Sequence, residues 1–173
     1  MKYFPHLYRL DAEDRYLIWI SNESEGVVAD AEGFVLTFND ADAVRSHADL
    51  KHYQLEDEEP ILQDLDWVGT WLNTPGMPVN CVEALNAWNL FSDVARSIQG
   101  RGRAFERLDP QFPGIYRKLF WGNNLPSLTP EGKHFTPQWS PDEITALTEV
   151  LGAGLEMFRS CTRRFQQDFQ QDS

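Results

Sequence analysis

Carboxylates are the most abundant side chains here that could do chemistry, and six of them lie close together in the chain. These are Glu56, Asp57, Glu58, Glu59, Asp64 and Asp66. Such oxygen ligands can bind a divalent cation, but the run lacks the Asp-x-Asp-x-Asp-Gly order of a calcium loop. Paired carboxylates can also act as the acid and base of a glycosidase. That pairing depends on distances in the fold, so the abundance of acids does not by itself predict a hydrolase.

The nitrogen ligands and nucleophiles form no catalytic or metal-binding pattern. The four histidines never occur as HxxxH or HExxH, and no GxSxG elbow is present. Cys81 and Cys161 are single and far apart, and each falls on the apolar face of an expected helix. Buried, reduced thiols are the better interpretation, which indicates the cytoplasm. The sequence therefore predicts no metal site, no cofactor and no enzymatic activity.

The negative charge is confined to one half of the chain. Residues 1–93 contain 18 Asp and Glu against 5 Lys and Arg, a net charge of −13, and residues 94–173 contain 9 against 10. A negative face of this kind steers a basic partner into contact, whereas the plainer interpretation is solubility. Binding of nucleic acid is disfavoured because phosphates need clusters of Lys and Arg.

No membrane or export signal is expected. The longest apolar runs fall short of the ~18 residues of a membrane-spanning helix, and residues 1–6 contain no apolar core of a secretory signal. We therefore expect a soluble, cytoplasmic protein, and the oligomeric state is left open.

The elements that must position these side chains predict an α+β fold in a single domain over residues 1–173. Residues 1–40 alternate between β-prone runs and turns, which predicts an N-terminal antiparallel sheet of about four strands, at 6–10, 16–20, 27–29 and 34–38. Residues 41–165 are helix-rich, with helices at 41–52, from about Ile61 or Leu65 to Leu72, at 80–99 and at 141–165. Residues 101–128 are expected to connect the two longest helices, with no helix assigned within them, and the tail over 166–173 is expected to be frayed. Strands followed by helices favour helices packed on one face of the sheet.

Three stretches carry local signals. Ser140-Pro141-Asp142-Glu143 is a complete capping box for the last helix. The stretch from Phe120 to Pro126, with Gly-Asn-Asn at its centre, predicts a rigid turn that either fastens the connector to the core or binds a ligand. On the 80–99 helix, Asn89, Ser92 and Asp93 lie opposite the apolar stripe, which predicts a solvated face.

Four stretches together resemble small bacterial proteins encoded beside polymorphic toxins. They are Asp64-Leu65-Asp66-Trp67-Val68, Ala87-Trp88-Asn89-Leu90-Phe91-Ser92-Asp93-Val94-Ala95, Leu119-Phe120-Trp121-Gly122-Asn123-Asn124-Leu125-Pro126 and Trp139-Ser140-Pro141-Asp142-Glu143. Among such proteins are the immunity proteins of contact-dependent growth inhibition systems, and the resemblance runs from about Leu7 to Phe165. It implies an inhibitor that binds its cognate toxin domain, often a basic nuclease, and blocks the active site. No family motif fixes the contact residues.

The predicted contact surface therefore comes from charge. We expect the basic partner to meet the six acids named above, Glu56 to Glu59, Asp64 and Asp66, with Trp67 and Tyr53 as aromatic anchors. An acidic regulatory or adaptor module that binds some other protein is the alternative, and a small hydrolase is the third hypothesis.

Overall fold

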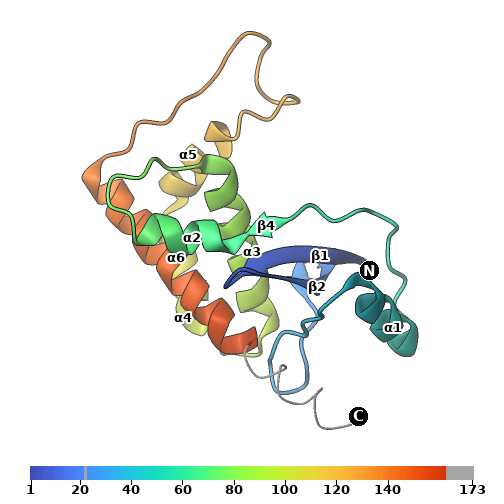
Figure 1. Cartoon of the computed structure of the whole chain (residues 1–173). Coiled ribbons are helices and arrows are strands. Elements are labelled where there is room, and N and C mark those ends of the chain that lie inside the picture. The colour runs from blue at the N-terminus through green and yellow to red at the C-terminus, as the bar shows by residue number, and fades with distance from the viewer. Residues whose placement is uncertain (22, 163–173) are drawn as a thin grey trace.

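A long two-stranded hairpin lies at the centre of the fold, which the computed structural model describes over residues 1–21 and 23–162 (Figure 1). Strand β1 (Lys2–Leu10) pairs antiparallel with β2 (Glu13–Ser21) from Lys2↔Ser21 to Leu10↔Glu13. The two turn residues, Asp11 and Ala12, have φ of 56° and 61°. Two left-handed residues form the type of tight turn that matches the twist of a hairpin.

Short strands complete a four-stranded sheet of order β3-β2-β1-β4. Strand β3 (Gly26–Val27) is antiparallel to β2, and β4 (Gln63–Asp64) runs parallel to β1. The predicted α+β class and number of strands are confirmed. The fourth strand, however, comes from the acidic stretch and makes the sheet mixed.

The strand expected at residues 34–38 is wrong. That segment forms only isolated bridges, Val35 with Ala29 and Phe38 with Tyr16. Its apolar side chains are divided between two separate cores, since Val35 belongs to the larger cluster and Phe38 to the smaller. The backbone N–H of Val35 donates to the carbonyl of Cys161, 3.3 Å away, and not to a neighbouring strand. Three of these five residues are therefore buried without a continuous ladder.

The helices begin and end close to the predicted bounds. They are α1 (Ala41–Lys51), α2 (Leu65–Leu72), α3 (Cys81–Ser97), α4 (Arg103–Leu108), a 3-10 turn η1 (Asp109–Gln111), α5 (Pro113–Gly122) and α6 (Pro141–Thr162). The connector over 101–128, to which no helix was assigned, contains α4, η1 and α5. Prolines in the first turns of η1 and α5 start these helices instead of breaking them. The tail over 166–173 lies outside the described residues.

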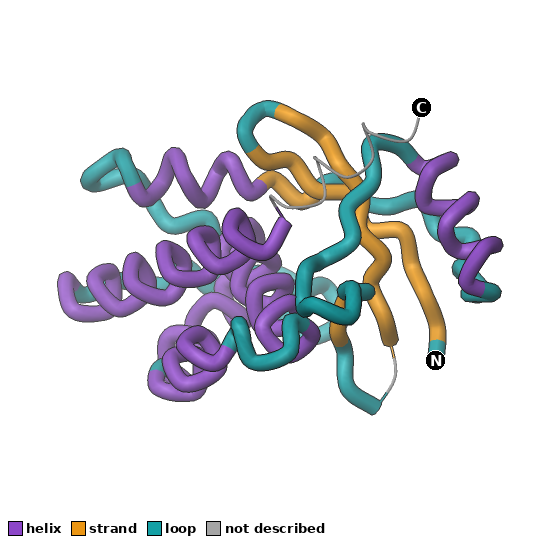
Figure 2. Tube along the Cα trace, turned by 90° about the horizontal axis from the view of Figure 1, so that it is seen from below, coloured by secondary structure: helices purple, strands orange, loops and turns teal. Residues whose placement is uncertain are grey.

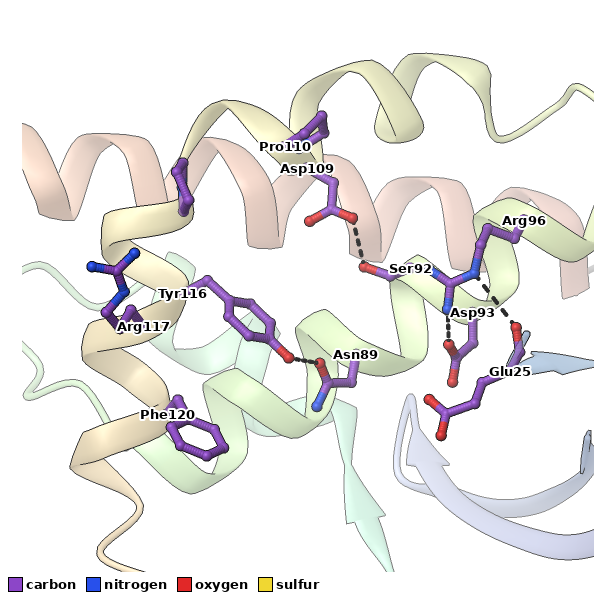
Figure 3. A pocket seen from close by; sticks show the side chains of 11 residues that line it. Glu25, Asn89, Ser92, Asp93, Arg96, Asp109, Pro110, Tyr116, Arg117 and Phe120 are labelled. Carbon is purple, nitrogen blue, oxygen red and sulfur yellow. Dashed lines mark hydrogen bonds and ion pairs between the residues drawn. The ribbon is translucent and has the colours of Figure 1, made fainter. Parts of the chain in front are cut away.

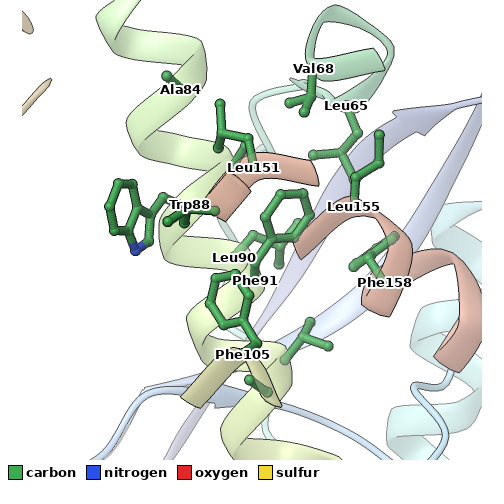
Figure 4. Packing of buried hydrophobic residues seen from close by; sticks show 14 of the residues in the cluster. Leu65, Val68, Ala84, Trp88, Leu90, Phe91, Phe105, Leu151, Leu155 and Phe158 are labelled. Carbon is green, nitrogen blue, oxygen red and sulfur yellow. The ribbon is translucent and has the colours of Figure 1, made fainter. Parts of the chain in front are cut away.

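The main core forms around α3, which packs against α2, α4, α5 and α6. Figure 4 shows its contacts with α2, α4 and α6. Phe91 of α3 is fully buried, and its ring centroid lies 6.2 Å from that of Phe158 in α6 and 6.3 Å from that of Phe105 in α4. Both cysteines, Cys81 and Cys161, are free and buried in this cluster. The prediction of buried thiols at apolar helical positions is confirmed.

Both faces of the sheet are covered (Figure 2). Tyr8, Leu10 and Leu17 face the helical bundle, and the Tyr8 ring meets Phe158 edge-on at 5.1 Å. On the opposite face, Ile18 packs in a smaller cluster with Val44 of α1. The helical half thus packs on one face as predicted, except that its first helix lies on the other.

The acidic stretch of the sequence forms an arch at the sheet edge, which we call the bow and define as residues 56–62. Leu55 bridges to Tyr3, and Gln63 pairs with Tyr8, both in parallel orientation. Between these two contacts β1 has four residues and the bow has seven. The excess length must leave the plane of the sheet, and the bow arches away from β1 between α1 and β4 (Figure 1). Pro5 of β1 lies opposite the bow, where its missing N–H breaks no ladder bond.

Candidate partner-binding cleft

A cavity of about 680 Å³ lies between the bow, β1 and α3, and we call it the acidic cleft. Phe4 and His6 of β1 and Trp19 of β2 form one wall, the bow forms a second, and α3 forms a third with Leu90 and Asp93. Four carboxylates line it: Glu25, Glu58, Glu59 and Asp93. None of the Lys or Arg residues in the described part of the chain is among the lining residues. The cleft is therefore a negative, partly aromatic hollow.

A second cavity of about 570 Å³ continues from the cleft between α3 and α5 (Figure 3). Glu25, Asn89, Asp93 and Tyr116 line both cavities. The tyrosine hydroxyl donates to the Oδ1 of Asn89 at 2.8 Å, which fixes α5 against α3 where the two cavities meet. The two cavities thus form one continuous surface. In the second cavity, Arg96 and Arg117 line the wall together with carboxylates, so this end carries charges of both signs.

Asp93 fixes the floor of the cleft. Its Oδ2 accepts the indole N–H of Trp19 at 2.8 Å, and its Oδ1 accepts from the guanidinium of Arg96. The side chain is buried, and this desolvation raises the pKa of the carboxyl above its usual value. The expectation of a solvated face holds for Asn89, which is exposed, and is wrong for Asp93, which faces Trp19 of β2 and joins the helix to the sheet.

Asp109 has a similar joining role in the second cavity. The indole N–H of Trp88 donates to its Oδ1 at 2.7 Å, and the hydroxyl of Ser92 donates to its Oδ2 at 3.1 Å. Ser92, which was also expected on the solvated face, is thus half-buried and engaged. Both oxygens of Asp93 and of Asp109 have a donor, so these carboxylates hold elements together and are poorly placed as a free acid and base.

His6 and Gln63 close the cleft where β1 meets β4. The Nε2 of His6 lies 2.8 Å from the Oε1 of Gln63. Burial lowers the pKa of His6, although this hydrogen bond acts in the opposite direction, so the neutral ring is favoured. The Nε2 of Gln63 is buried and has no hydrogen-bond partner among the described residues. Gln63 thus carries one buried amide donor for which the described residues supply no acceptor.

The structure separates the predicted contact acids of the bow into different environments. Glu58 and Glu59 line the acidic cleft and are exposed. Asp57 is exposed but is not a lining residue, and Glu56 pairs with Lys2 at 3.2 Å. Only two of the four acids of the run therefore face the cavity.

The two other predicted acids, Asp64 and Asp66, stabilise the start of α2. Asp64 is the N-cap residue, and its Oδ1 accepts from the backbone N–H of Asp66 at 3.0 Å. The carboxylate of Asp66 accepts the backbone N–H groups of Asp11 and Ala12, both at 2.7 Å. These acids join α2 to the turn of the β1–β2 hairpin.

The predicted aromatic anchors pack against neighbouring rings. Trp67 stacks on Trp71 with centroids 6.1 Å apart, and Tyr53 stacks on Tyr3 at 4.2 Å. Both are half-buried. Neither is among the residues that line the cleft, whose aromatic walls come from elsewhere.

Sequence reasoning missed Trp19 and Glu25 as cleft residues. Trp19 was noted only as part of a strand, and nothing in the spacing places it beside Asp93, 74 residues later. The alternation in β2 puts Trp19 on the same face as the buried Leu17, and this is the one local signal that could have identified it.

The Gly-Asn-Asn stretch fastens the loop that follows α5. Asn123 donates from Nδ2 to the carbonyl of Cys81 at 3.0 Å, and Asn124 exchanges two hydrogen bonds with the backbone of Phe135. A Cβ at Gly122 would lie 2.4 Å from the Sγ of Cys81. The stretch was expected either to fasten the connector to the core or to bind a ligand, and these contacts favour the first interpretation. Trp121 remains about half exposed beside the loop.

No family model, curated protein or solved structure matches this chain. Within residues 1–21 and 23–162, no group of three or more His, Cys, Asp or Glu side chains is arranged to hold a metal ion. No helix of the described part is long and apolar enough to cross a membrane.

Proposed function

We propose that this chain is an immunity-type inhibitor that binds a basic toxin domain through the acidic cleft and covers the active site of that domain. The observation that carries the proposal is the lining of the cleft, where Glu25, Glu58 and Glu59 form no ion pair with a described Lys or Arg and Asp93 alone is paired, with Arg96 of the second cavity. A hollow with this composition is complementary to a protruding basic side chain or loop.

The charges at the rim are available to a partner. Glu25, Glu58 and Glu59 are exposed and form no ion pair with any residue that the structure describes. They lie within the half of the chain that carries a net charge of −13. Such a field mainly accelerates encounter with a positive surface, so its effect is expected in the association rate.

Apolar groups beside these charges supply contact area. Ile61 of the bow is 89% exposed, and Phe4 and Trp19 form the facing wall. The hydrogen bond from Trp19 to Asp93 holds that wall in place before a partner arrives. A fixed wall loses little side-chain entropy on binding, which favours affinity.

The test uses charge reversal at equal net charge. Glu58→Lys with Glu59→Lys changes the cleft, and Glu149→Lys with Glu156→Lys changes exposed positions of α6 by the same four charge units. We expect the first double variant to slow association with the basic toxin domain encoded by an adjacent reading frame by about tenfold or more at low salt. The loss should shrink in 0.5 M salt, where the screening length falls below ~8 Å. The second variant should associate much faster than the first.

Inhibition distinguishes this proposal from the two alternatives. An inhibitor abolishes the activity of the bound toxin domain at equimolar ratio, whereas an adaptor binds without this effect. Equal slowing by the two double variants, or binding with full toxin activity, would contradict the proposal. Of the carboxylates that a hydrolase could use, those of Asp93 and Asp109 are engaged on both oxygens, which leaves the exposed Glu25, Glu58 and Glu59 as the candidates for that hypothesis.

A further inference from the structure

We infer that the acidic cleft accepts an arginine side chain of the partner and discriminates against lysine. This inference rests on the proposed function and names the residue that the cleft recognises. It is argued from the charge of the lining, from the shape of the aromatic wall and from the rigidity of the floor.

The charge of the cleft requires a cation. Its lining contains four carboxylates, and His6 and Tyr116 are the only other titratable side chains among the described lining residues. His6 is kept neutral by burial, since its pKa is lowered, and the pKa of Tyr116 is raised, so neither offsets the negative charge at pH 7. Arg96 does reach Asp93, but it does so from the second cavity and leaves the rim acids Glu58 and Glu59 unpaired among the described residues.

The wall opposite the bow suits a planar cation. The rings of Phe4 and Trp19 lie 5.4 Å apart with an angle of 53° between their planes. Because Trp19 is held by Asp93, a guanidinium can stack on this wall without reordering it. Arginine also presents five donors in a rigid fork and is more weakly hydrated than a lysine ammonium, which favours it at a site that combines rings with several carboxylates.

The size of the cleft leaves room for the chain that carries the arginine. A volume of about 680 Å³ exceeds that of one guanidinium, so adjoining peptide groups can enter as well.

The test uses two peptides, acetyl-Gly-Arg-Gly-amide and acetyl-Gly-Lys-Gly-amide, titrated into the isotope-labelled full chain. The indole N–H of Trp19 is the reporter in two-dimensional NMR spectra, because it lies in the wall and is bonded to Asp93. We expect the arginine peptide to shift this signal and to bind about fivefold or more tightly than the lysine peptide.

Matched variants assign the site. Glu58→Gln with Glu59→Gln removes two charges from the lining, and Glu23→Gln with Asp57→Asn removes two from exposed neighbours that do not line it. The first pair of substitutions should lower the affinity for the arginine peptide by about threefold per carboxylate, and the second pair should lower it by much less. Equal affinity of the two peptides, equal effects of the two variants, or no shift of the Trp19 signal would overturn the inference.

These outcomes are separable from those of the proposed function. Inhibition of the toxin domain that survives equal binding of the two peptides would refute only the arginine preference. Selective binding of the arginine peptide without inhibition of any basic toxin domain would refute the proposed function and leave the side-chain preference standing.

Discussion

Replacing Gly154 of α6 by alanine tests how closely α6 packs on α3. A Cβ at this position would lie 2.1 Å from the Cδ2 and 2.6 Å from the Cγ of Phe91. Carbon atoms in ordinary contact are about 3.5–4.0 Å apart, so the ring or the helix would have to move by more than ~1 Å. Phe91 is fully buried between Phe105 and Phe158 and has nowhere to move. Overpacking of this kind costs about 1–3 kcal/mol.

Gly152, two residues earlier in the same helix, provides the control. A Cβ there would meet no atom within 4 Å. Glycine to alanine inside a helix stabilises by ~1 kcal/mol, and this gain applies equally to both positions. It therefore cancels in the comparison. The free energy of unfolding of Gly154→Ala should lie below that of Gly152→Ala by about the full overpacking cost, ~1–3 kcal/mol.

The assay is urea unfolding of both variants and the native chain, followed by circular dichroism. Gly152→Ala should raise the midpoint above that of the native chain, and Gly154→Ala should lie below Gly152→Ala at an unchanged slope. Equal midpoints for the two variants would refute the reasoning, because they would mean that α6 does not approach Phe91 as closely as described.

Three other perturbations have defined outcomes. Asp66→Ala removes the acceptor of two hairpin N–H groups and should lower the free energy of unfolding by about 1–3 kcal/mol, with Asp66→Asn in between; native-like urea stability of Asp66→Ala would contradict this. Burial raises the pKa of the Cys161 thiol to about 12, and Cys81 is buried as well. Ellman's reagent at pH 8 should therefore label both thiols only as fast as the protein opens. Prompt labelling of the native chain would show that the thiols are not buried. The pKa of His6 is lowered from 6.5, so the stability that its neutral form contributes is present above pH 6.5 and is lost as the pH falls through the pKa of the folded state. As the pH is lowered, the urea midpoint of the native chain should therefore decline more steeply than that of His6→Gln. Parallel pH curves for the two proteins would contradict this prediction.

Local signals predicted local structure well. The capping box at α6 forms as expected, since Ser140 Oγ accepts from the N–H of Glu143 at 3.2 Å and Glu143 accepts from the N–H of Ser140 at 2.8 Å. Asn80 likewise caps α3. Such bonds join residues two or three positions apart, so the sequence contains everything that determines them.

The sheet edge and the cleft depend on contacts that no local pattern encodes. Strand β4 has only two residues and pairs with β1 across 55 positions, and its short length leaves no alternation to detect. Asp93 was placed in solvent because a helical period identifies a polar side without saying which element faces it. In the fold that side meets Trp19, and the pair is stable because the indole satisfies the buried carboxylate.

Charge asymmetry predicted a contact surface in the first half of the chain, where the four carboxylates of the cleft also lie, but it did not indicate which acids line a cavity. Glu58 and Glu59 face the hollow because the bow is longer than the strand beside it. Asp64 and Asp66 have the same charge but accept backbone N–H groups at the start of α2 and in the hairpin turn. A sequence shows how many acids there are and leaves open which of them have backbone partners.

The contact between the first strand and the last helix bears on how the chain folds during synthesis. The β1–β2 hairpin can close within about 1–10 μs once it has emerged. Phe158, which covers Tyr8, and Arg159, which pairs with Asp11, follow almost 150 residues later. At translation rates of about 5–20 residues per second, that delay is about 8–30 s. During this time the apolar face of the hairpin is without its final cover, so a nascent chain is most prone to aggregate before α6 is made, and slower synthesis of the second half lengthens the exposure.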